Sequence, residues 1–291
     1  HHGLPTIVGS APEILMAAIA ARTERIRIGS AGVMLPHYSA LKVAEQFRVL
    51  EALAPGRIDL GVGRAPGGDM RTARALNPNA YAAADNFPEQ VRDLQAWTAE
   101  AGHLGITAHP RGAHAPEIWI LGSSDYGAQL AAHFGLPYAF AYFFTDGQGA
   151  AQALDLYRQL YKPSERHPRP QATVCVWALA AETRDAALHA ALSRERWRVD
   201  RARGIFGPLQ PPDDIAARGF NATEMHTIDA MRAKAFVGTA AEVAQQLREL
   251  ARGFERDELV VNTWAHDPAL RRRSYALLAR EFDLPSAVAP R

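Results

Sequence analysis

The sequence contains a single cysteine, Cys175, among its 291 residues. A disulfide bond within the chain is therefore excluded, and so are metal sites that need several thiolates. Apolar residues flank Cys175 on both sides, so we expect an inert cysteine in a buried strand rather than a reactive thiol. One unpaired thiol is typical of a cytoplasmic protein, and we expect that location.

The sequence also lacks a long apolar run, a visible secretory signal and an excess of either charge. No run reaches the 18 or so residues that a membrane span requires. The 32 basic and 31 acidic residues give a net charge of +1. The densest basic run, Arg271 to Arg273, is interpreted as the solvated face of a helix. These absences argue against a membrane partner and against nucleic acid.

What the sequence does contain is a regular alternation of extended and helical segments. The pattern predicts strands at 25–30, 58–62, 116–121, 138–142, 172–180 and 258–263. It predicts helices at 12–21, 40–53, 86–101, 128–134, 149–161, 185–201, 239–252 and 268–282. This alternation indicates an α/β fold with a parallel sheet, but local patterning does not separate a barrel from a doubly wound sheet.

Local signals mark some of these boundaries and one loop. Ser10 precedes the first helix as a candidate capping residue, and Thr239 with Glu242 forms a capping box. Residues 65–79 are rich in Gly, Pro, Asn and Arg and are too long for a neutral connector, so they are a candidate binding loop.

The turn Gly122-Ser123-Ser124 stands between a predicted strand and a predicted helix. Unpaired N–H groups at a helix start, together with two hydroxyls, suit a phosphate. For an isolated Ser-Ser pair, ordinary helix capping is the simpler interpretation. The nearby Gly61-Val62-Gly63 is not a dinucleotide fingerprint, because the third glycine is missing.

Three motifs together extend this interpretation: His1-His2-Gly3-Leu4, Ser30-Ala31-Gly32 and Gly61-Val62-Gly63-Arg64. In this order the sequence resembles the bacterial luciferase-like flavin monooxygenases, especially the single-component homologues of the luciferase subunits, and the similarity continues to the region of Trp264. The resemblance implies a (β/α)8 TIM barrel, with residues 1–291 as one domain. The resemblance also implies that, compared with a complete barrel of that family, the sequence lacks the first strand and helix at the N-terminus. A tag is the alternative explanation of the two leading histidines.

The resemblance also implies roles for individual residues. The flavin phosphate is held in that family at positions matching Arg64, Ser123, Ser124 and Gly127. A cis peptide lies under the flavin ring at the equivalent of Ala31–Gly32, although a plain strand-ending glycine is the alternative there. The position of His1 is associated with proton transfer, and His2 is its neighbour.

Other histidines and aromatic residues give weaker signals. His37 either faces substrate or, as we favour, is an exposed loop histidine. No compact ligand spacing indicates a metal site, and the histidines of the polar segment 102–115 are expected at the surface: His103, His109 and His114. The aromatic run 142–144 either lines a site or packs in the core.

The implied activity is a flavin-dependent monooxygenase that uses reduced FMN and dioxygen to oxygenate a small organic substrate. A separate flavin reductase would supply the reduced FMN, and a homodimer is expected. Two alternatives stay open. One is a deazaflavin-dependent oxidoreductase, and the other is a non-catalytic flavin-binding protein.

Overall fold

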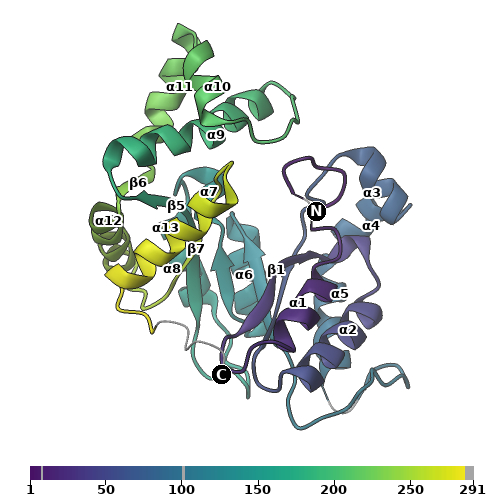
Figure 1. Ribbon diagram of the computed structural model, residues 1–291. Helices are drawn as coiled ribbons and strands as arrows, with labels where there is room; N and C mark the ends of the chain where they lie inside the picture. Colours follow the sequence, from purple (N-terminus) through teal and green to yellow (C-terminus); the bar gives the residue numbers. More distant parts are fainter. Residues whose placement is uncertain (8, 100–101, 286–291) are drawn as a thin grey trace. The chain divides into compact units, whose positions relative to one another are not determined.

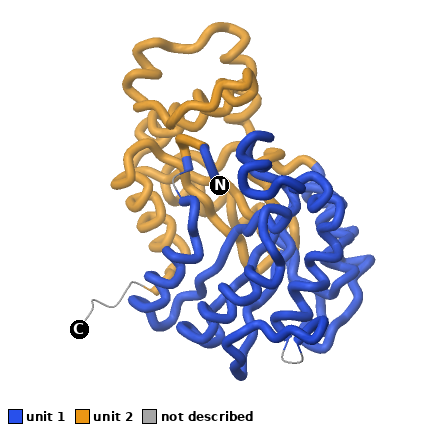
Figure 2. Tube along the Cα trace, turned by 90° about the vertical axis from the view of Figure 1, so that its right-hand side faces the viewer, with its two compact units in different colours: residues 1–3, 7–140, 149–172 blue, residues 4–6, 141–148, 173–291 orange. Residues whose placement is uncertain are grey.

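The computed structural model describes residues 1–7, 9–99 and 102–285, and these residues form two compact units (Figures 1 and 2). Unit 1 comprises residues 1–3, 7–140 and 149–172, and unit 2 comprises residues 4–6, 141–148 and 173–291. That residues 1–291 form a single domain stays a prediction. None of the helices in the described ranges has the length and apolar character to cross a membrane.

Unit 1 contains four neighbouring parallel strands. They are β1 (Ile28–Met34), β2 (Ile58–Gly63), β3 (Glu117–Gly122) and β4 (Tyr138–Phe140). The apolar residues of β2, namely Ile58, Leu60 and Val62, are completely buried, as expected for a strand covered on both faces. The predicted α/β fold with parallel strands is confirmed.

The helices of unit 1 follow or connect these strands. They are α1 (Pro12–Ala20), the 3-10 turn η1 (Leu35–His37), α2 (Ala40–Leu53), α3 (Met70–Leu76), α4 (Ala80–Asp85), α5 (Phe87–Thr98), α6 (Asp125–Phe134) and α8 (Ala150–Leu160). Val43, Ala44, Phe47 and Leu50 form the buried face of α2, at the spacing of a helix that covers a sheet.

Unit 2 has three strands of its own. The central strand β5 (Ala172–Ala181) pairs in parallel with β6 (Phe236–Thr239) and with β7 (Leu259–Asn262). The helices are α7 (Tyr142–Thr145), α9 (Arg184–Ala202), α10 (Pro212–Arg218), α11 (Ala222–Arg232), α12 (Ala240–Gly253) and α13 (Pro268–Glu281). The predicted capping box of Thr239 and Glu242 is confirmed at the start of α12.

Several local predictions were wrong. The cap of α1 is Ala11, without a side-chain hydrogen bond, so Ser10 does not cap this helix. The predicted loop 65–79 contains α3, whose cap Asp69 accepts hydrogen bonds from two backbone N–H groups. The predicted strands and helices do not include β6 or α11. The last residues of the helix predicted at 86–101 lie outside the described residues, and α5 ends at Thr98.

Candidate functional site

The carboxyl ends of β1, β2 and β3 bring the predicted cofactor residues to one edge of unit 1. Ala31 pairs with Gly61 and Met34 with Gly63 across β1 and β2, and Gly61 pairs with Trp119 across β2 and β3. Since the strands are parallel and neighbouring, the residues that follow their ends lie at the same edge. Arg64 directly follows β2, and Ser123 and Ser124 directly follow β3. Ala31 and Gly32 lie within β1, three and two residues before its end at Met34.

The turn at Ala31 and Gly32 is open on one face and closed on the other. Both residues are exposed, and the peptide bond between them is cis, as the resemblance implies. A Cβ atom on Gly32 would lie 2.7 Å from the carbonyl oxygen of Gly61, so β2 itself requires a glycine here. The hydroxyl of Ser30 donates a hydrogen bond of 2.8 Å to the same Gly61 oxygen. The close approach of β1 and β2 therefore leaves a small-residue surface facing outward.

The Ser123-Ser124 turn leads into α6 without using a hydroxyl as a cap. Ser124 is the N-cap in an extended conformation, but its side chain makes no capping hydrogen bond. The capping interpretation of the two serines is therefore wrong for Ser124. The first N–H groups of the ten-residue helix α6 have no side-chain acceptor at the N-cap, so they are available to an anion.

Arg64 adds a positive charge to the start of α6. Its guanidinium carbon lies 4.1 Å from the centroid of the Tyr126 ring, in the first turn of that helix. A cation stacked on an aromatic ring in this way is held by the ring quadrupole. The fold thus brings Arg64 close to the serine turn, although Arg64 and Ser123 are 59 residues apart in the sequence.

Gly127 serves packing between α6 and the sheet. It is buried, and a Cβ atom there would lie 3.3 Å from the Tyr138 ring and 3.4 Å from the Cα atom of Gly122. The missing side chain lets the first turn of α6 approach the end of β3. Gly127 therefore helps to position the Ser123-Ser124 turn through the backbone.

His1 and His2 lie in the same region of unit 1. A Cβ atom on Gly67 would collide with both the His1 ring and the sulfur of Met34, the last residue of β1. His1 itself is exposed. Nε2 of His2 lies 2.6 Å from the hydroxyl of Tyr38. Burial, followed by the adjacent N-terminal charge, lowers the pKa of His2.

His37 differs from its prediction as an exposed loop histidine. Only 4% of it is exposed, and its Nε2 lies 2.8 Å from the carbonyl oxygen of Pro66. It therefore ties η1 to the loop that precedes α3. Among the aromatic residues of 142–144, the Tyr142 ring packs against Phe236 and Phe254 at centroid distances of 5.9 and 6.4 Å.

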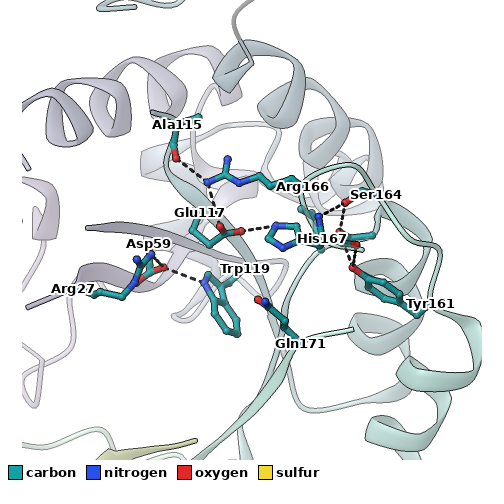
Figure 3. Close-up of polar contacts among 12 residues, drawn as sticks. Arg27, Asp59, Ala115, Glu117, Trp119, Tyr161, Ser164, Arg166, His167 and Gln171 are labelled. Atoms are coloured by element: carbon teal, nitrogen blue, oxygen red, sulfur yellow. Dashed lines mark hydrogen bonds and ion pairs between the residues drawn. The ribbon is translucent and has the colours of Figure 1, made fainter. Parts of the chain in front are cut away.

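A polar cluster at the opposite edge of unit 1 was not predicted (Figure 3). Glu117, the first residue of β3, has its Oε1 atom 2.6 Å from Nε2 of His167 and its Oε2 atom 3.1 Å from Arg166. Beside it, Arg27 and Asp59 form a bidentate ion pair, in which Nε and Nη2 of Arg27 donate hydrogen bonds of 3.0 and 2.7 Å to the two carboxylate oxygens. The partners lie tens of residues apart, so no local sequence signal links them.

A cavity of about 400 Å³ adjoins this cluster. Its lining includes Arg27, Glu51, His114, Glu117 and Arg166. Since Ile58 and Glu117, the first residues of β2 and β3, both line it, the cavity lies at the amino ends of the strands. It is thus at the other edge of the strands from the predicted flavin residues.

Comparison with known proteins gives a consistent picture. A family model described as luciferase-like monooxygenase matches residues 1–255. A luciferase-like monooxygenase of Escherichia coli (strain K12) is 38% identical over 278 residues, which cover 95% of this chain and 83% of that protein.

Two solved structures are similar in fold. The crystal structure of apo-MsnO8 has a TM-score of 0.88 at 34% identity and covers 99% of this chain and 87% of its own. The second is the oxygenating constituent of 3,6-diketocamphane monooxygenase from Pseudomonas putida, a type II Baeyer-Villiger monooxygenase in complex with FMN. It has a TM-score of 0.63 at 17% identity and covers 96% of this chain and 84% of its own.

Proposed function

The chain belongs to the luciferase-like monooxygenase family, and we propose that it is a flavin-dependent monooxygenase that uses reduced FMN and dioxygen to oxygenate a small organic substrate. The observation that carries the proposal is the position of Arg64 over the first turn of α6, 4.1 Å from the Tyr126 ring. A guanidinium beside free helix N–H groups is a site for a phosphate.

The residues at this edge fit the two parts of FMN. The N–H groups of α6 and the hydroxyls of Ser123 and Ser124 would donate to the phosphate, and Arg64 would balance its charge. The exposed Ala31 and Gly32 carry no bulky side chain, so a flat ring has room against β1. When bound, reduced FMN supplies the electrons that activate dioxygen.

His1 is our candidate for proton transfer. An imidazole changes its protonation near neutral pH, so it can hold or release a proton at a reacting group. The His1 ring and the sulfur of Met34 both lie beside Gly67. Since Met34 is the last residue of β1, the His1 ring is near the carboxyl end of that strand. The role itself rests on the resemblance to the family.

We also propose a separate flavin reductase as partner, a homodimer and a cytoplasmic location. The Pseudomonas putida relative is named as the oxygenating constituent of its monooxygenase, which supports a second component for this chain. On α1, Ile14 and Leu15 are 66% and 58% exposed, and these apolar side chains offer a surface to a second copy. Light scattering of the purified protein tests the dimer.

Calorimetry tests the cofactor. The protein is titrated with reduced FMN without oxygen, with oxidised FMN in air and with a deazaflavin cofactor. We expect the tightest binding for reduced FMN. Preference for the deazaflavin would favour the hydride-transfer alternative. Flavin binding without oxygenation of any tested substrate, in the presence of a reductase, would favour the non-catalytic alternative. Failure to bind any of these cofactors would refute the proposed function and both alternatives.

A further inference from the structure

Arg194, on α9 of unit 2, is a buried arginine without an acidic partner. Only 8% of it is exposed, and the described residues include no carboxylate within ion-pair distance of it. The two carboxylates whose charges act on Arg194, Glu195 and Asp146, are already engaged. Glu195 accepts two hydrogen bonds of 2.7 Å from Arg232, and Asp146 accepts hydrogen bonds of 2.7 and 2.8 Å from Arg198.

The contacts that hold Arg194 are weak for a buried charge. Its guanidinium carbon lies 4.1 Å from the centroid of the Trp177 ring, and it donates one long hydrogen bond of 3.5 Å to the carbonyl oxygen of Phe143. Removing a guanidinium from water costs free energy that only a counter-ion or several good acceptors offset. Burial, with the like charge of Arg198 adding to it, lowers the pKa of Arg194 to about 9.

Trp177 contributes a second donor without a partner. The residue is 5% exposed, and its indole Nε1 is enclosed and has no hydrogen-bond acceptor among the described residues. Buried indole N–H groups are normally hydrogen-bonded. Trp177 pairs with Asn262, the last residue of β7, so its backbone lies level with the carboxyl end of that strand.

Apolar side chains surround these two donors. Trp177 belongs to the buried cluster of unit 2, against which Phe143, Leu188 and Trp264 also pack. A ligand here would therefore meet a cation and an N–H donor next to an apolar wall.

We propose that Arg194 and Trp177 form an anion-binding site within unit 2 that takes a carboxylate attached to an apolar body. One guanidinium is balanced by one negative charge, and its planar fork matches the two oxygens of a carboxylate. The indole N–H would supply a further donor, and the apolar side chains of the cluster would contact a hydrocarbon chain. The site consists of residues of unit 2 alone and does not rest on the proposed flavin chemistry.

The test uses the flavin-free protein with acetate and hexanoate as probes, and with hexanamide as the neutral counterpart, at constant ionic strength. Calorimetry measures affinity, and NMR follows the indole N–H signal of Trp177, which the Trp177→Phe variant identifies. We expect a carboxylate to bind and to shift that signal, and hexanamide to bind at least tenfold more weakly than hexanoate.

Variants then assign the donors. Arg194→Met keeps an apolar stem beside Trp177 and is expected to weaken hexanoate binding about tenfold or more. Trp177→Phe keeps a ring but removes the N–H, and a smaller loss is expected. The matched control is Arg201→Met, since Arg201 is exposed on the same helix and lies 5.1 Å from the Trp197 ring.

Three results would overturn the proposal: neither carboxylate binds, hexanamide binds as tightly as hexanoate, or folded Arg194→Met retains the full affinity. Circular dichroism checks the fold of each variant. If Arg194→Met does not fold, the comparison of hexanoate with hexanamide and the Trp177 signal still decide the question. Failure of FMN to bind would leave these results unaffected, so the two proposals are tested separately.

Discussion

Replacement of Arg64 by alanine should weaken FMN binding through the phosphate alone. A hydrogen bond between charged groups contributes about 1.5–3 kcal/mol, and the exposure of Arg64 favours the lower end because water screens the pair. A loss of about 1.4 kcal/mol corresponds to a tenfold weaker dissociation constant. We therefore expect FMN to bind Arg64→Ala about tenfold more weakly than the unaltered protein.

Riboflavin, which has the same ring but no phosphate, isolates this effect. Calorimetry with both ligands and both proteins forms a thermodynamic cycle, and riboflavin affinity should stay the same in Arg64→Ala. The control is Arg74→Ala, which removes an equal charge from an exposed position on α3. The loss should also shrink at high salt. An equal loss for riboflavin, or an unchanged FMN affinity, would refute the assignment of Arg64 to the phosphate.

Three further predictions concern stability and reactivity. Glu117→Gln removes the charge 2.6 Å from the His167 ring and should lower the free energy of unfolding in urea by about 1 kcal/mol or more; an unchanged midpoint would contradict this. The ion pairs of Glu224, chiefly with Arg196, lower its pKa from 4.5 to about 2, so its stabilising effect is complete above pH 4.5 and is lost as the pH falls towards 2. As the pH falls from 4.5 to 2, the melting temperature of Glu224→Gln should therefore fall less than that of the unaltered protein. An equal fall in the two proteins would contradict the stabilising role of the ion pairs. Burial raises the pKa of the Cys175 thiol to about 11, so iodoacetamide at pH 8 should modify the folded protein much more slowly than the unfolded one, and equal rates would show that the thiol is accessible.

The elements that the sequence predicts well are those with strong local signals. The helix predicted at 40–53 matches α2 at both ends, because a capping residue precedes it and its apolar spacing is regular. The capping box of α12 is likewise a contact between residues three apart. By the same reasoning α11 was within reach, since Asn221 and Glu224 form a capping box at its start.

Other features depend on distant residues. β6 has only four residues, too few for a periodic pattern, and it is a strand because Phe236 pairs with Ala178 of β5. Arg48 is charged yet 3% exposed, because its guanidinium donates hydrogen bonds to the carbonyl groups of Thr98 and Ala99 at the end of α5. Apolar spacing alone does not predict a buried arginine at that place.

The sequence by itself determined the alternation of strands and helices, the absence of a disulfide, and the Ser123-Ser124 turn before a helix. These follow from residue types and from spacings within one element or one turn, whereas the assignment of Arg64 to a phosphate came from the resemblance to a family. Only the tertiary structure decided that Arg64 stacks on Tyr126 and that His37 is buried. It also decided that, among the described residues, Arg194 has no acidic partner and the Trp177 N–H has no acceptor. Those properties arise from packing between elements far apart in the chain, where neighbouring residues set burial and hydrogen bonding, and no local pattern encodes them.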